Sequence, residues 1–224
     1  WAQGIKARNQ THNGPYSDNI SDNISDNKSA KEKEKMLTFS VNEAVMRIEV
    51  CDADIIRVQY FPGGEITQSG INTFTADYNK DFNEYDVSES DDGLTVTTSK
   101  IRMEVNKTTG QIKYYDAKTD ELILSERDRS SKEITLDNGA ISYEVSQEFI
   151  SNDNEALYGF GNVNGIMGIK GQSISIAQLN TEKRTPMFYS NMGYGILFDI
   201  TSNGKLDWLE DNSVYRYEGY ASDR

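Results

Sequence analysis

Apolar and polar residues alternate with period two in three successive segments that follow residue 36. Every second residue is apolar at 37–41, 46–50 and 56–60. Because successive side chains of a strand point to opposite faces of its sheet, this alternation predicts half-buried antiparallel strands. Pro62, Gly63 and Gly64 follow the third segment and predict a turn there.

The alternation resumes after a polar insert, which we expect to extend over 65–92. Turn-forming residues at 106–110 and 117–120 separate the later apolar segments, and the charged segment 127–132 is predicted to be a loop. Apolar spacing typical of helices is scarce. The pattern therefore predicts an all-β meander of hairpins, with further strands around 94–96, 101–105, 112–114, 122–124 and 141–145.

Residues 1–35 form a polar head that contains the repeated tetrapeptide Ser-Asp-Asn-Ile. A segment this poor in apolar side chains cannot offset the entropy that is lost on ordering, so we predict a flexible tail or surface loop. Asp18, Asp22 and Asp26 recur every fourth residue, but they lack the alternating oxygen ligands and the glycine of a calcium loop. We therefore expect no metal site in the head, and one domain over 36–224.

Composition excludes several classes of function. The net charge of −13 disfavours nucleic acids and anionic membranes as partners, because phosphate binding needs clustered Lys and Arg. The chain has one cysteine, Cys51, and one histidine, His12, which exclude an intramolecular disulfide, a Cys/His zinc site and a Ser-His-Asp triad. No motif implies a cofactor. Cys51 follows an apolar segment and is expected to be a buried, inert thiol.

The stretch 155–199 is the most informative part of the sequence. It opens with Leu-Tyr-Gly-Phe-Gly and closes with Gly-Tyr-Gly-Ile-Leu-Phe-Asp. Glycines that alternate with large aromatic residues suit strands that another backbone approaches closely, since glycine has no side chain on the crowded face. These glycines are not a phosphate-binding loop, because no Gly-Lys-Ser/Thr follows them.

The order of these pieces resembles the N-terminal domain of glycoside hydrolase family 31, the α-glucosidase and α-xylosidase family. The resemblance is specific over about forty-five residues and extends more loosely back to Leu37. It implies an antiparallel β-supersandwich of the galactose-mutarotase type. The residues that carry it are Glu155, Tyr158, Gly159 and Gly161, then Asn180, Thr181 and Glu182, and finally Pro186, Ser190, Gly193, Tyr194, Gly195, Phe198 and Asp199.

The resemblance also implies that the catalytic residues lie outside this chain. In the family, two aspartates on a (β/α)₈ barrel that follows the N-terminal domain carry out retaining hydrolysis of α-linked glucosides or xylosides. No alternation of strands and helices appears in the 224 residues. We therefore expect no catalytic residue here, and expect the barrel of the intact protein and an α-linked oligosaccharide as partners. A secreted or periplasmic location would suit such an enzyme.

The same resemblance assigns one loop to the sugar pocket. In the family, the acid of an Asn-x-Asp tripeptide reaches the pocket and hydrogen-bonds sugar hydroxyls. The matching residues are Asn180, Thr181 and Glu182, and glutamate is one methylene longer than aspartate. Glu182 is therefore either a substrate-binding residue or an ordinary solvated acid.

Three alternatives remain. The chain could be a stand-alone carbohydrate-binding module that stacks sugars on Trp208, Tyr215, Tyr217 or Tyr220. It could also be an inert scaffold, which would expose an apolar face where the barrel docks. An aldose-1-epimerase shares the fold but needs several histidines. Residues 205–224 end in a strand-like pattern, from which we expect the protein to continue.

Overall fold

A computed structural model describes residues 36–66, 82–162, 167–177, 180, 183–199 and 202–221. The predicted polar head 1–35, which includes His12, lies outside the described residues. Most of the predicted polar insert 65–92 also lies outside them. The division into head and domain therefore stays a prediction.

The described part of the chain is built from strands, and its paired strands are antiparallel, which confirms the predicted fold class. Its elements in order are β1 (Met36–Val41), β2 (Ala44–Asp52), β3 (Ile55–Phe61), β4 (Tyr85–Glu89), β5 (Gly93–Thr98), β6 (Ile101–Asn106), β7 (Ile112–Asp116), β8 (Leu122–Thr135), β9 (Ile141–Ile150), β10 (Leu157–Gly159), β11 (Ile174–Ile176), β12 (Met187–Ser190), β13 (Gly195–Leu197), β14 (Gly204–Leu209), a 3₁₀ turn η1 (Glu210–Asn212) and β15 (Val214–Ala221).

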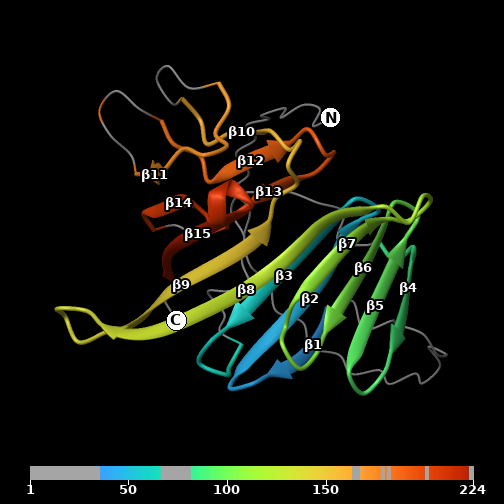
Figure 1. Cartoon of the computed structure of the whole chain (residues 1–224). Coiled ribbons are helices and arrows are strands. Elements are labelled where there is room, and N and C mark those ends of the chain that lie inside the picture. Colours follow the sequence, from blue (N-terminus) through green and yellow to red (C-terminus); the bar gives the residue numbers. More distant parts are fainter. Residues whose placement is uncertain are drawn as a thin grey trace, which may run out of the picture. The chain divides into compact units, whose positions relative to one another are not determined.

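A nine-stranded sheet in the order β11-β14-β15-β9-β8-β7-β6-β5-β4 forms the largest layer, and the three-stranded sheet β1-β2-β3 packs against one end of it. In Figure 1 the blue and cyan strands β1 to β3 lie against the green strands β4 to β7. Met46 and Ile48 of β2 are fully buried against Val96, Met103 and Ile112 of the large sheet. Two sheets that pack their apolar faces together in this way form a β-sandwich.

A second core joins the other end of the large sheet to a small sheet, β10-β12-β13. Leu157, Phe160 and Phe188 come from the stretch 155–199, and they pack with Tyr215 and Tyr217 of β15. The ring centroids of Phe188 and Tyr215 lie 5.5 Å apart in an edge-to-face contact, a favoured arrangement of aromatic pairs. The aromatic residues of the informative stretch therefore build core.

The turns follow from local side-chain chemistry. Asn106 Oδ1 accepts hydrogen bonds from the amides of Thr108 and Thr109, both at 2.9 Å, and Gly110 has a φ of 73° that favours glycine. In the same way, Asp116 Oδ1 accepts hydrogen bonds from the amides of Lys118 and Thr119. These Asx turns confirm the two corners predicted at 106–110 and 117–120.

Two sequence predictions were wrong. The charged segment 127–132 is not a loop but the middle of β8, which pairs with β9 through a bulge between Glu126 and Arg129. Most of its side chains are exposed. An exposed strand can carry charged side chains just as a loop does, so the charges alone do not distinguish the two. A strand, β4, also lies in the predicted polar insert; it is a mostly exposed edge strand, and such edges are commonly polar. Cys51 is buried, as predicted.

Candidate functional site

The stretch 155–199 contains the three strands of the small sheet and β11, which is an edge strand of the large sheet. Tyr158 of β10 pairs with Tyr189 of β12, and Met187 of β12 pairs with Leu197 of β13. In the sequence the predicted sugar loop lies between β11 of the large sheet and β12 of the small sheet. It therefore connects the two sheets.

Two glycines let the backbones meet at the C-terminal end of the predicted loop and at β12. Gly159 has a φ of 144°, and a Cβ there would lie 2.6 Å from the Cα of Phe188. Gly161 has a φ of 79°, and its Cβ would collide with the carbonyl oxygen of Lys183. Any larger side chain would push the two segments apart. The prediction of a close backbone approach at these glycines is confirmed.

Main-chain hydrogen bonds then hold the C-terminal end of the predicted loop. The amide of Asn162 donates to the carbonyl oxygen of Lys183 at 2.9 Å, and the amide of Phe160 donates to that of Met187 at 2.7 Å. Asn180 is exposed in a turn. Thr181 and Glu182 lie outside the described residues, so their roles stay predictions.

The first acid of the motif has a structural role. Glu155 is buried, and its Oε1 accepts hydrogen bonds from Ser190 Oγ and from the Tyr194 hydroxyl, both at 2.5 Å. The amide of Asn152 donates to Oε2 at 3.2 Å. The hydroxyls of Tyr194 and Tyr215 are 2.8 Å apart, which extends the network into the core.

Burial is the main cause that raises the pKa of Tyr194 and of Tyr215, and both stay protonated donors or acceptors within this network. A buried carboxylate is stable only when its oxygens are hydrogen-bonded, and Glu155 meets this condition. Sequence reasoning named Glu155, Ser190 and Tyr194 but missed their contact. No local rule links residues that are 35 and 39 positions apart.

The last acid of the motif also makes a structural contact. Asp199 Oδ2 lies 3.5 Å from the Arg57 guanidinium of β3, and Glu49 of β2 lies 3.6 Å from the same side chain. The ion pair ties the end of the stretch 155–199 to the sheet β1-β2-β3. Both acids of the motif that the structure describes thus support the fold.

The aromatic residues proposed as a stacking platform do not form one. Tyr215 and Tyr217 are buried in the core, and the partly buried Trp208 donates its indole N–H to the carbonyl oxygen of Ile169 at 2.9 Å. Only Tyr220 is exposed among the four. A sugar ring needs an open aromatic face, so the buried Tyr215 and Tyr217 cannot stack a sugar, and the binding-module alternative stays a prediction that rests mainly on the exposed Tyr220.

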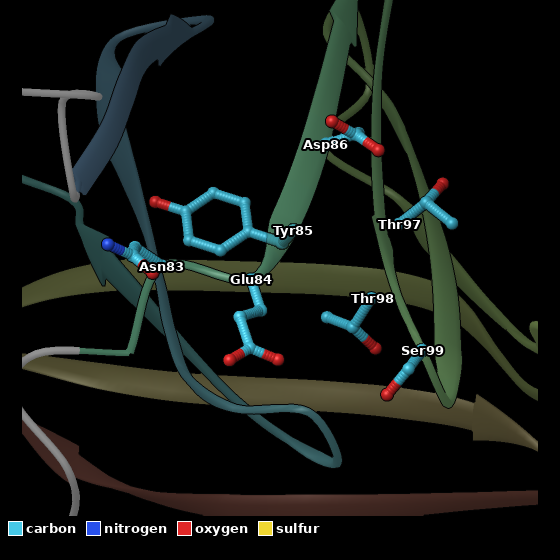
Figure 2. Close-up of a pocket in the computed structure, with 7 residues that line it drawn as sticks. All are labelled: Asn83, Glu84, Tyr85, Asp86, Thr97, Thr98 and Ser99. Atoms are coloured by element: carbon cyan, nitrogen blue, oxygen red, sulfur yellow. The ribbon is translucent and has the colours of Figure 1, made fainter. Parts of the chain in front are cut away.

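A shallow depression of about 440 Å³ lies beside β4 and β5, at the opposite end of the large sheet from β11. Figure 2 shows its lining residues: Asn83, Glu84, Tyr85, Asp86, Thr97, Thr98 and Ser99. Thr98 uses its hydroxyl to donate to the carbonyl oxygen of Ala53 at 2.5 Å. Ligand pockets are mostly apolar with a few polar groups, and this polar hollow lacks that character.

Within the described ranges, no group of three or more His, Cys, Asp or Glu side chains is placed to hold a metal ion. The same part of the chain contains no helix with the length and apolar character of a membrane span.

Two curated relatives match parts of the chain. An α-xylosidase of Saccharolobus solfataricus is 25% identical over 123 residues, which cover 50% of this chain and 16% of the relative. An uncharacterised family 31 glucosidase of Pseudescherichia vulneris is 28% identical over 74 residues, which cover 33% of this chain and 14% of the relative.

Solved structures extend the likeness over most of the chain. A family 31 α-xylosidase from Xanthomonas citri superposes with a TM-score of 0.70 and 28% identity, over 79% of this chain and 20% of that one. A family 31 α-xylosidase from a soil metagenome, complexed with xylose, gives a TM-score of 0.68 and 19% identity, over 84% and 31%; at this identity it shows the fold alone. The chain spans less than a third of each of these relatives.

The sequence model that describes the glycosyl hydrolase 31 N-terminal galactose mutarotase-like domain matches residues 45–207. This range includes β3 to β13 and the whole stretch 155–199. The contacts of Glu155 with Ser190 and Tyr194 and the close approach at Gly159 and Gly161 lie within the match, as does most of the sandwich. The chain therefore belongs to glycoside hydrolase family 31, as its N-terminal galactose mutarotase-like domain.

Proposed function

We propose that this chain is the non-catalytic N-terminal domain of a retaining α-glycosidase that acts on an α-linked glucoside or xyloside. In the intact enzyme it packs on a (β/α)₈ barrel, which supplies the catalytic acid and the nucleophile, and it lends the loop 180–183 to the edge of the sugar pocket. The family match over 45–207 supports the class of enzyme, and the curated α-xylosidase relative supports the class of substrate.

The observation that carries the loop assignment is its anchored end. The contact between Gly161 and Lys183, together with the hydrogen bond from the Asn162 amide, fixes the main chain next to Glu182. A loop that is held at its base presents its side chains at lower entropic cost than a free one. We therefore assign substrate binding to Asn180, Thr181 and Glu182.

Glu182 is the residue with the strongest expected effect. A carboxylate that accepts a hydrogen bond from a sugar hydroxyl contributes about 1.5–3 kcal/mol, which corresponds to roughly 10- to 100-fold in kcat/KM. The longer glutamate side chain would favour one sugar over another, because its oxygen reaches a different position from that of aspartate. The loop therefore tunes substrate preference and does not perform the bond cleavage.

The test uses the intact enzyme with aryl α-xyloside and aryl α-glucoside. Glu182→Ala is expected to lower kcat/KM for one substrate at least several-fold more than for the other, and Glu182→Asp to change the ratio again. Glu144→Ala, which removes an exposed acid from β9, is the matched control. If Glu182→Ala behaves like the control with both substrates, the loop assignment is wrong.

A separate measurement addresses the catalytic assignment. The 224-residue chain alone, at high protein concentration, is expected to hydrolyse neither aryl glycoside, because the catalytic carboxylates are assigned to the barrel. Turnover that persists through repurification would place an active site in this chain and contradict the proposal.

A further inference from the structure

The short strand β12 exposes an apolar and an aromatic side chain. Met187 and Tyr189 are 47% and 58% exposed, whereas Phe188 and Ser190 are buried. A strand at the surface of a sandwich normally buries its apolar residues and exposes polar ones. In β12 a methionine and a tyrosine occupy the exposed positions. One of the two buried positions is occupied by Ser190, whose hydroxyl donates to Glu155.

The neighbouring strands add apolar side chains to the same face. Leu197 of β13 pairs with Met187 and is 37% exposed. Tyr158 of β10 pairs with Tyr189, and their rings stack with centroids 5.7 Å apart and planes inclined by 24°. We call these four residues, Tyr158, Met187, Tyr189 and Leu197, the outer face. In Figure 1 the three strands that carry it are drawn in orange and red.

The core does not require this face to be apolar. The opposite side of the small sheet already packs on the large sheet through Leu157 and Phe188. Four apolar or aromatic side chains on three adjacent strands form a continuous patch, and such patches mark sites of association. Tyrosine and methionine are also enriched in the cores of protein interfaces.

The chemistry of the outer face favours a protein surface over a sugar as its occupant. A sugar ring presents hydroxyls around its rim and needs polar side chains beside the aromatic ring that it stacks on. Met187 and Leu197 offer no hydrogen bond, and the two tyrosines offer one hydroxyl each. A second copy of the chain is also disfavoured, because two bodies that each carry a net charge of −13 repel one another.

We infer that the outer face is the surface on which the rest of the intact protein docks. This inference rests on the proposed function, because it takes the catalytic domain as the occupant. The family 31 α-xylosidase that the chain resembles is about five times as long as the matched part, which covers 20% of it. The loop 180–183 leads into β12, the strand that carries Met187 and Tyr189, and its end at Lys183 accepts a hydrogen bond from the amide of Asn162. Docking there would bring the loop and the catalytic domain together.

The test compares Met187→Ser/Tyr189→Ser in the intact enzyme and in the 224-residue chain. Both side chains are exposed in the domain alone, so the substitutions should leave the thermal unfolding midpoint of the isolated chain nearly unchanged and reduce its binding of a hydrophobic dye. In the intact enzyme they should lower the midpoint by several degrees and speed limited proteolysis several-fold. Val87→Ser, on the edge strand β4 and 37% exposed, is the control.

Several outcomes would overturn the inference. Equal effects in the intact enzyme and the isolated chain would show that nothing docks on the outer face. A dimer of the isolated chain that the double substitution dissociates, without effect in the intact enzyme, would assign the face to a second copy. Saturable binding of maltose or xylose oligosaccharides that the substitution abolishes would assign it to sugar. An intact protein with no α-glycosidase activity would overturn the proposed function, while the difference in unfolding would still report on docking.

Discussion

The carboxylate of Glu155 accepts a hydrogen bond of 2.5 Å from the hydroxyl of Tyr194, which lies 39 positions further along the chain. The bond links the segments that lead into the two outer strands of the small sheet, because Glu155 precedes β10 and Tyr194 precedes β13. Two residues of the family motif thus stabilise the small sheet, and the predicted sugar loop leads into β12 of this sheet.

Disruption of this pair should destabilise the domain. Glu155→Ala leaves the hydroxyls of Ser190 and Tyr194 without their buried acceptor, so we expect a loss of about 2–4 kcal/mol in the free energy of unfolding. Tyr194→Phe should cost about 1–2 kcal/mol. Urea denaturation of both variants and of Glu155→Ala/Tyr194→Phe measures their coupling. If the two effects add independently, the residues do not act as one network.

The close approach at Gly161 can be separated from its backbone conformation. Gly161 and Gly139 both have a φ of 79°, but a Cβ at Gly139 would meet nothing within 4 Å. Each Gly→Ala substitution carries the strain of the left-handed conformation, about 1–3 kcal/mol. Only Gly161→Ala also displaces Lys183. We expect its urea midpoint to fall well below that of Gly139→Ala, and equal midpoints would show that the loop end is not clamped.

Glu126 should make the stability of the domain depend on pH. Burial raises the pKa of this carboxyl from its ordinary 4.5 to about 7, against the opposing effects of the Arg129 guanidinium and of the hydrogen bond from the Ile112 amide. A raised pKa means that the folded state binds the proton more tightly. The resulting stabilisation is complete below about pH 4.5 and is lost as the pH rises through about 7.

The measurement is the free energy of unfolding in urea at pH 5 and at pH 8. Glu126→Gln cannot titrate, so it should remove a pH-dependent contribution on the order of 3 kcal/mol between these values. The exposed Glu121 on the preceding turn gives the control variant Glu121→Gln. A pH dependence that Glu126→Gln leaves intact would assign it to other groups.

Removal of the polar head tests the domain boundary that the sequence predicts. A chain of residues 36–224 should unfold within about 2 °C of the full chain, since 1 kcal/mol shifts the midpoint of a domain of this size by about 2–4 °C. Limited proteolysis of the full chain should cut first within 1–35. A larger fall in the midpoint would mean that the head contributes to the folded domain.

Much of the fold could be predicted from local patterns. The alternation at 37–41, 46–50 and 56–60 became β1, β2 and β3 because period two places one face of each strand in the core. The turn at 106–110 could be predicted because an asparagine side chain binds nearby main-chain amides and glycine adopts a positive φ. Both preferences act over a few residues. The spacing of glycines and aromatics was enough to expect the close approach at Gly159 and Gly161.

The segments that the sequence misassigned are those whose structure depends on a distant partner. Residues 127–132 carry charges on both faces and lack a periodic pattern, and they remain a strand because β9 supplies their hydrogen bonds. Strand β4 likewise depends on β5. An alternating pattern arises when one face of a strand is buried. These strands are mostly exposed on both faces, so their sequences lack the alternation.

The sequence by itself determined the all-β class and the family, because these rest on short-range periodicity and on the order of a motif. Only the tertiary structure decided what the motif residues do. In that structure Glu155 accepts hydrogen bonds from Ser190 and Tyr194, Asp199 forms an ion pair with Arg57, and Tyr215 is buried in the core. The physical reason is that a buried charge or ring takes its role from the groups that surround it, and those groups come from strands far apart in the chain.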